Sequence, residues 1–314
     1  MRRTMIVAAA AVMLAGLVPP AGGTTFPEVI PVPQGSYPEG IAIGAGHRAY
    51  VGSLLDGAVY AFDLRSGEGE VLVPGQEGRI TLGMEGDDRS GLLWAVGQHA
   101  GAGRLFAFDA RTGAEVVDIP VPGAFLNDLT VTRTAVHVTD SFADVLWTVP
   151  LGIRGLPVGP ATSLPLSGDF EFVTEGELPV NLNGLVATPD GAWLISCHTS
   201  LGVLYRIDPR TGHATEIDLG GTTVPSGDGL VMVGHTLYVV QNFLNQIGVV
   251  ALDPGVTTGS VGDPIASPHF QVPATAAVFG NALYAVNARF DVGFPPFFGG
   301  DLMVLDYHAV RVSR

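Results

Sequence analysis

Cysteine and charged residues are scarce in this sequence. Its 314 residues include one cysteine, Cys197, so no disulfide can form within the chain and its stability must come from packing. Charged residues make up 14%, with 15 basic against 30 acidic side chains and a formal net charge of −15. We therefore expect neither nucleic acid nor an anionic membrane surface as a partner, while acidity by itself names no substrate.

Long apolar runs are missing after the first two dozen residues. Residues 1–23 hold Arg2 and Arg3, then an apolar run from Met5 to Val18, then small residues and prolines. This order is typical of a secretory signal peptide, whereas the alternative, a membrane anchor, would need about 20 apolar residues. We expect residues 24–314 to form one domain that is secreted or periplasmic and has no contact with the membrane after cleavage.

Two common catalytic signatures are missing as well. The sequence has no G-x-S-x-G motif, so a serine hydrolase mechanism has no support. It also has no glycine-rich loop between a strand and a helix, the arrangement that binds nucleotide phosphates. Neither a serine hydrolase nor a nucleotide-binding enzyme is therefore expected.

A repeated phrase organises the rest of the chain. Its fullest copy runs from Asn181 to Gly212: a polar residue and a glycine, an apolar strand, a Pro-Asp-Gly turn, and two more apolar strands that end in an Asp-Pro-Arg-Thr-Gly turn. Five weaker copies place the opening position at intervals of 43 to 56 residues, which is the period of a propeller blade. The six opening positions are Glu39, Leu82, Asn127, Asn183, Asp228 and Thr275.

The repeat predicts an all-β fold, a six-bladed β-propeller with four-stranded antiparallel blades, with seven blades as the alternative. Residues 24–35 carry prolines at nearly alternate positions, which suits an edge strand, and we expect them to close the ring against the last blade. The longest interval contains Gly152–Leu178, which is rich in Pro and Gly and is expected to form a loop over one face. The last blade is expected to end at Asp306.

Four opening positions carry side-chain oxygens and are called the axial set here: Glu39, Asn127, Asn183 and Asp228. Because the innermost strand of every blade lines the central channel, these side chains should converge. Two carboxylates and two amide carbonyls suit calcium or another hard divalent cation better than zinc, whose usual His and Cys ligands are absent from these positions. Asp128 adds a carboxylate as an outer-shell or catalytic candidate. A water-filled polar channel without a bound ion is the alternative.

These motifs resemble the SMP-30/gluconolactonase/LRE-like six-bladed propellers, which are related to the paraoxonases and strictosidine-synthase-like proteins. The resemblance rests on the PEG run at Pro38, the NDL run at Asn127, the NGL run at Asn183 and the DGL run at Asp228, and it covers nearly all of the mature chain. It implies that the axial set holds one catalytic divalent cation, usually calcium, and that Asp228 also acts as the base.

Two departures from the family pattern bear on the substrate. Sugar-lactonase members carry Arg two residues before the unit-three Asn, where this sequence has Phe125, and Glu39 lies in a run closer to the paraoxonase side. We therefore expect a small, rather apolar ester or lactone, with Phe125 and Phe297 binding it. His99 follows the second strand of unit two and resembles in placement the histidine that paraoxonases use near their calcium, so it is a further catalytic candidate.

The sequence thus favours an exported, calcium-dependent lactonase or arylesterase that works as a monomer on a small molecule. Asp228, together with His99, would activate water. Two alternatives stay open: a non-catalytic propeller that binds a ligand or protein and keeps the ion for structure, and a non-hydrolytic enzyme of the strictosidine-synthase-like type.

Overall fold

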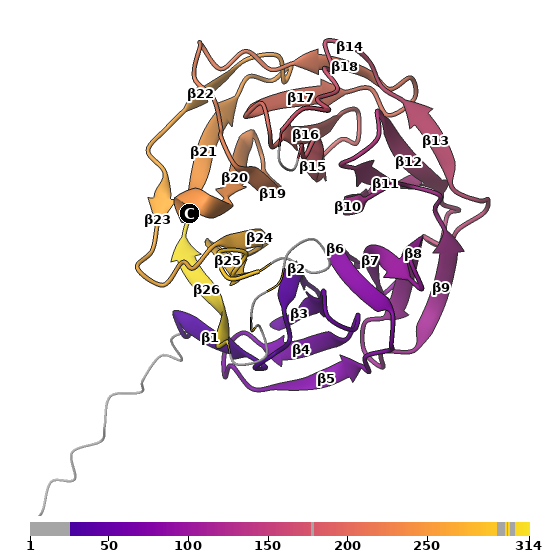
Figure 1. Cartoon of the computed structure of the whole chain (residues 1–314), viewed down its shortest axis with the longest axis vertical. Coiled ribbons are helices and arrows are strands. Elements are labelled where there is room, and N and C mark those ends of the chain that lie inside the picture. Colours follow the sequence, from indigo (N-terminus) through magenta and orange to yellow (C-terminus); the bar gives the residue numbers. More distant parts are fainter. Residues whose placement is uncertain (1–25, 177–178, 294–298, 300, 302–304) are drawn as a thin grey trace, which may run out of the picture.

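Six small sheets form a ring around a common axis (Figure 1). Two cavities lie along this axis, and the space that they occupy is called the channel here. The computed structural model describes residues 26–176, 179–293, 299, 301 and 305–314. The predicted signal peptide at 1–23 and Phe297 lie outside these residues. The six-bladed, all-β prediction is confirmed, and blades one to six contain four, four, four, five, five and four strands.

The first three blades follow one another along the chain. Each begins with the strand next to the channel and proceeds outward by antiparallel pairing. Their strands are β2 (Pro38–Ile43), β3 (Arg48–Ser53), β4 (Val59–Asp63) and β5 (Gly69–Val73); β6 (Arg79–Asp87), β7 (Leu92–His99), β8 (Ala102–Asp109) and β9 (Glu115–Pro120); β10 (Leu126–Val131), β11 (Ala135–Asp140), β12 (Val145–Pro150) and β13 (Thr162–Pro165).

The last three blades repeat this order with short additions. Two-residue strands, β14 (Ser167–Gly168) and β23 (Ile265–Ala266), extend blades four and five, and β14 pairs parallel with β18. The remaining strands are β15 (Leu182–Ala187), β16 (Leu194–His198), β17 (Val203–Ile207) and β18 (His213–Glu216); β19 (Gly227–Val233), β20 (Thr236–Gln241), β21 (Gln246–Leu252) and β22 (Gly259–Val261); β24 (Pro273–Phe279), β25 (Ala282–Asn287), β26 (Tyr307–Ser313) and β1 (Val29–Val32).

The N-terminal segment closes the ring, as predicted. Strand β1 runs antiparallel to β26, with Val29 opposite Val310 and Val32 opposite Tyr307 (Figure 1). The prediction that the last blade ends at Asp306 was wrong, because β26 begins at Tyr307. β1 and β26 are therefore the two outermost strands of blade six.

The segment Gly152–Leu178 is not only a loop over one face, so that prediction was wrong in part. It contains β13, which is the outer strand of blade three, and β14, which lies on the edge of blade four. Its Pro and Gly content hid these strands because both lie on sheet edges, where such residues are tolerated. Residues 152–158 do form a turn at the surface, in which Ile153 is almost fully accessible.

Burial decreases from the channel outward. The second strands, such as β7 and β11, are buried over nearly their full length because a neighbouring blade covers each face of the sheet. The outer strands β5 and β9 expose most of their residues. Helix is nearly absent from the described residues: they contain a single 3-10 turn, η1 (Asn242–Leu244), and no helix among them is long and apolar enough to cross a membrane.

Candidate metal centre

Every inner strand carries a β-bulge at the same point near its start. In β10, Leu126 pairs with Asp140 and the next paired residue is Leu129, opposite Val138, so three steps on one strand match two on the other. A bulge re-aims the side chain beside it and recurs next to functional sites. The residues that directly follow the last pair before the bulge, called the bulge position here, are Glu39, Leu82, Asn127, Asn183, Asp228 and Ala274.

The bulge shows that the alignment of the last unit was wrong by one residue. Ala274, not Thr275, is equivalent to Asn183. Thr275 occupies the next position, and its hydroxyl donates to the carbonyl of Glu39 (2.8 Å). Only the pairing register distinguishes the two positions, and a single sequence does not display that register. The other residues at this next position are Asp128 and four glycines: Gly40, Gly83, Gly184 and Gly229.

The axial set meets in one cavity of about 110 Å³ at the entrance of the channel, called the upper cavity here. Asn127, Asn183 and Asp228 come from the consecutive blades three, four and five, and Glu39 comes from blade one on the opposite side of the ring. The wall above them is aromatic and consists of Phe125, Phe142, Phe243 and Phe290. The structure thus brings together the four predicted ligands and the predicted substrate-binding Phe125.

The two amides of the axial set direct their oxygens toward the cavity. Asn127 donates its Nδ2 to Ser141 Oγ (3.0 Å), and Asn183 donates its Nδ2 to Thr199 Oγ1 (3.2 Å). Within the described residues, Asn183 Oδ1 has no hydrogen-bond partner although the residue is 6% exposed. Glu39 Oε2 is likewise buried without a donor.

These unpartnered oxygens fit a cation. A buried oxygen without a donor is costly, and a buried carboxylate more so, unless a proton or a cation compensates. Both carboxylates are within the channel, with Glu39 and Asp228 each 3% exposed. The described residues contain no group of three or more His, Cys, Asp or Glu side chains arranged to hold a metal ion, so a site here depends on the two amides.

Burial raises the pKa values of both carboxyls in the axial set. For Glu39 the rise comes first from burial and then from the negative charges of Asp228 and Asp128. For Asp228 burial is again the largest cause, and hydrogen bonds from Asn242 and Asn183 partly oppose the rise in pKa. A divalent cation would reverse this effect, because it favours the ionised form of every carboxyl that it touches.

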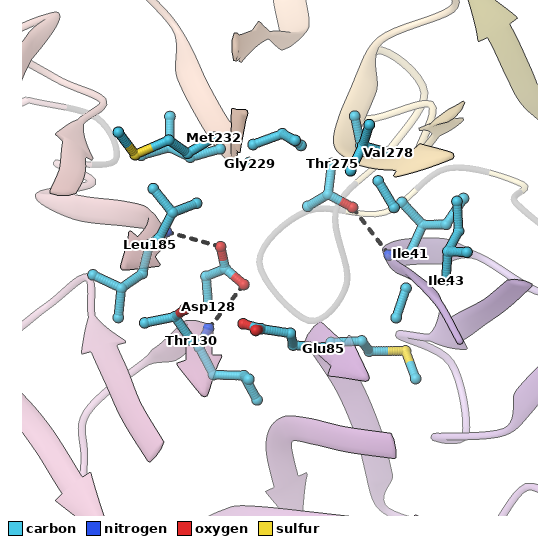
Figure 2. Close-up of a pocket in the computed structure, with 18 of the residues that line it drawn as sticks. Ile41, Ile43, Glu85, Asp128, Thr130, Leu185, Gly229, Met232, Thr275 and Val278 are labelled. Carbon is cyan, nitrogen blue, oxygen red and sulfur yellow. Dashed lines mark hydrogen bonds between the residues drawn. The ribbon is translucent and has the colours of Figure 1, made fainter. Parts of the chain in front are cut away.

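Asp128 faces the other end of the channel. It lines a second cavity of about 270 Å³, called the lower cavity here, which is built from the later halves of the inner strands of all six blades. Figure 2 shows the carboxyl groups of Asp128 and Glu85 directed into this space. The backbone N–H groups of Leu185 (2.9 Å) and Leu129 (2.8 Å) donate to Asp128, and burial raises its pKa to about 7. Its carboxylate therefore acts on the axial set through its charge rather than by contact.

The remaining predicted site residues lie elsewhere. His99 ends β7, pairs with Arg79 and Ala102, and is not among the described residues that line the upper cavity. Phe297 belongs to the residues that are not described. The structure therefore gives no contact between His99 and the axial set.

Sequence reasoning missed three polar residues that contact the axial set. Ser141, Thr199 and Asn242 each follow the last residue of a second strand, 14 to 16 positions after the axial residue of the same blade. In the sequence they are marked by their position directly after the second strand of a unit, which can be recognised only when the last residue of that strand is known. Phe142 and Phe243 come directly after Ser141 and Asn242 and were missed for the same reason.

Comparisons with known proteins agree on the fold. No protein-family model matches the sequence, and no curated protein matches it. The structure of Mala s 1, the major allergen of Malassezia sympodialis, is similar over 91% of this chain and 96% of that chain, with a TM-score of 0.71 and 15% identity.

Two enzymes or enzyme-like proteins share the architecture at lower similarity. Virginiamycin B lyase from Staphylococcus aureus has a TM-score of 0.54 and 13% identity over 82% of this chain and 80% of that chain. A putative 6-phosphogluconolactonase from Bacteroides uniformis has a TM-score of 0.52 and 16% identity over 78% and 72%. The chain is thus a six-bladed β-propeller with distant likenesses to an allergen, a lyase and a lactonase-like protein, and at these identities the likeness shows the fold alone.

Proposed function

We propose that the protein is a divalent-cation-dependent hydrolase, with calcium as the cation, that opens a small neutral ester or lactone. The observation that carries the proposal is the axial set itself: four oxygen-bearing side chains at equivalent bulges, beside an aromatic wall. Two of the four have a buried oxygen to which none of the described residues donates. The motifs shared with SMP-30/gluconolactonase-like propellers support the same function. Export of the chain and action as a monomer are part of the proposal.

The residues of the site divide the chemistry among them. The axial set would hold the cation, which when bound supplies polarisation of the ester carbonyl and stabilisation of the oxyanion. Asp228 takes a proton from the attacking water, and contact with the cation would keep its carboxylate in the ionised form that a general base requires. Asn242 donates to Asp228 Oδ2 (3.1 Å) and keeps the carboxylate in place. His99 has no part in this proposal because it does not line the upper cavity.

The lining of the upper cavity supports a neutral, apolar substrate. No Lys, Arg or His lies among the described residues that line it, so an anionic sugar acid or phosphate would meet carboxylates without a compensating charge. Phe125 is 4% exposed and stacks on Phe142 with a centroid distance of 5.1 Å. This pair offers a flat apolar surface beside Asn127 to the acyl or aryl part of an ester.

An activity assay tests the proposal. Residues 24–314 would be purified, stripped of metal with a chelator, and assayed on γ- and δ-lactones and on phenyl and p-nitrophenyl esters, with and without Ca²⁺. We expect Ca²⁺-dependent turnover that falls at least about 100-fold in Asn183→Ala, the typical loss on removal of a charge-stabilising group. The exposed Asn281→Ala is the matched control and should keep full activity. The proposal is wrong if no activity appears, or if activity survives both chelation and Asn183→Ala.

A non-catalytic propeller that keeps the ion for structure is the second candidate. The small volume of the upper cavity favours it, since about 110 Å³ is below the roughly 300 Å³ usual for ligand pockets. In that case Ca²⁺ should raise the melting temperature while no substrate is turned over. A lyase would instead be recognised by its product, because elimination introduces no oxygen atom from ¹⁸O-labelled water.

A further inference from the structure

Three polar side chains occupy one equivalent place behind the axial set. Ser141 follows β11, Thr199 follows β16, and Asn242 follows β20. Each contacts the axial residue of its own blade: Ser141 contacts Asn127, Thr199 contacts Asn183, and Asn242 contacts Asp228, at 3.0 to 3.2 Å. The same contact thus recurs in blades three, four and five.

The two hydroxyls leave their amide partners one orientation. Ser141 donates its proton to the carbonyl of Leu182 (2.7 Å), and Thr199 donates its proton to the carbonyl of Gly227 (2.6 Å). A hydroxyl has one proton, so each oxygen can then only accept from the amide that faces it. That amide must present Nδ2 to the hydroxyl and Oδ1 to the cavity.

Asn242 is held in a corresponding way. Its Oδ1 accepts from the backbone N–H of Phe243 (2.7 Å), so its Nδ2 must face Asp228 and donates to Oδ2 (3.1 Å). A hydrogen bond to a carboxylate favours the ionised form. Asp228 is thereby fixed in position with one of its two oxygens already bonded.

The hydroxyls also connect successive blades. Leu182, whose carbonyl accepts from Ser141, directly precedes Asn183, and Gly227, whose carbonyl accepts from Thr199, directly precedes Asp228. One hydroxyl therefore orients the ligand of its own blade and holds the backbone next to the ligand of the following blade. The contacts form a relay from blade three through blade four to blade five.

In blades one and six this place holds an apolar residue. In blade six the bulge position is Ala274, which has no side chain to orient, and the equivalent residue after β25 is Ala288. In blade one that residue is Leu54, and the axial residue is Glu39. A carboxylate has two oxygens, so Glu39 presents an oxygen to the cavity in either orientation. Blade two departs from this pattern, because its bulge position is Leu82 and the equivalent residue after Gly97 is the polar Gln98. In blades three, four and five, by contrast, the polar residue at this place contacts the axial residue of its own blade.

We propose that Ser141, Thr199 and Asn242 are positioning residues that select which atoms of Asn127, Asn183 and Asp228 face the cation. This inference rests on the proposed metal site and deepens it. Outer-shell partners of metal ligands commonly change metal affinity by about 10- to 100-fold when they are removed.

The test is Thr199→Val, which keeps the branched shape and removes the acceptor for Asn183. Isothermal titration of the chelator-treated mature chain with CaCl₂ should give a Kd about 10- to 100-fold above that of the wild type. Thr199→Ser, which restores the hydroxyl, should return the Kd to within about threefold of the wild type. Thr81→Val is the matched control: Thr81 is also buried, and its hydroxyl accepts from the backbone N–H of Ser53 and donates to the carbonyl of Ser53, not to a member of the axial set.

Crystal structures of the wild type and Thr199→Val provide a readout that needs no metal. The Asn183 amide should turn in the variant, and an unchanged amide together with an unchanged Kd would overturn the positioning role. An equal loss of affinity in Thr81→Val would also overturn it, because the effect would then come from general loosening. If the wild type binds no divalent cation, the proposed function is wrong, and the Asn183 orientation in the two crystal structures alone decides the positioning role.

Discussion

Carboxyl groups along the channel make the stability of the protein depend on pH, and the partly buried Glu85 is one of them. Its Oε2 accepts from the backbone N–H of Val131 (3.0 Å), yet burial raises its pKa to about 7. A raised pKa in the folded state means that its contribution to stability is complete below the ordinary value near 4.5 and is lost as the pH rises through 7. Glu85 is thus a residue that favours folding in acid.

We predict that Glu85→Gln flattens the pH dependence of stability. The wild type in chelator should lose up to about 3 kcal/mol of unfolding free energy through this group between pH 5 and pH 8, and the variant should lose correspondingly less. Urea unfolding at a series of pH values measures both. Glu77→Gln, at an exposed position, is the control and should follow the wild type. A variant whose pH profile coincides with that of the wild type would contradict the prediction.

Single side chains also show the limit of sequence reasoning at the site. The repeat phase was sufficient to bring Glu39 and Asn183 to attention, because equivalent blade positions must converge on the axis. It was insufficient for Ala274 and Thr199. The β-bulge determines that Ala274, and not Thr275, is at the axial position of the last blade. Thr199 lies after the second strand, and the number of residues between this place and the axial residue differs from blade to blade. Whether the axial set binds a metal stays a prediction.

Strand β1 is the element that closes the ring, by pairing with β26. It supplies the outer edge of blade six, and Ile30 in its centre is fully buried in the main core. Its near-alternating prolines allowed its role to be predicted, since proline is tolerated on an edge. The start of its partner β26 was missed, because the sequence repeat gave the last blade an earlier end than the hydrogen bonding does.

We predict that Ile30→Ala destabilises the protein by about 2 to 4 kcal/mol, the usual cost of a large cavity in a well-packed core. Amide hydrogen exchange should also rise in β1 and β26 more than in the other blades, because the closure opens first. Val71→Ala on β5, where the side chain is 54% exposed, should change stability by less than about 0.5 kcal/mol. Uniform acceleration of exchange over all blades would argue against local opening.

The ring concentrates negative charge along its own axis in a chain that already has a net charge of −15. Four carboxyls line the channel: Glu39 and Asp228 at the upper cavity, and Asp128 and Glu85 at the lower. Burying these carboxyls costs free energy, which the packing of the six sheets offsets. A bound cation would lower that cost. The fold class and blade number followed from the repeat because every blade carries the same strand order.

We predict that Ca²⁺ stabilises the protein in proportion to its occupancy of the axial set. Free Ca²⁺ at 100 times Kd should add about 2.7 kcal/mol to the unfolding free energy, and the melting temperature should continue to rise with the logarithm of the concentration. Scanning calorimetry over a range of CaCl₂ concentrations measures this. Asn183→Ala should shift the curve to higher concentration, and a melting temperature independent of Ca²⁺ would contradict the prediction.

The pairing of β1 with β26 also sets an order in time. Residues 29–32 can find their partners only after residues 307–310 exist, so the ring cannot close until the chain has been synthesised to that point. Blades one to five can assemble from local hairpins. The pairing of β1 with β26 joins distant parts of the sequence, and because closing so long a loop has a high entropic cost, we expect it to form last. The newly made protein therefore passes through an open ring with an unpaired edge on β26, and that interval is when it is most exposed to wrong partners.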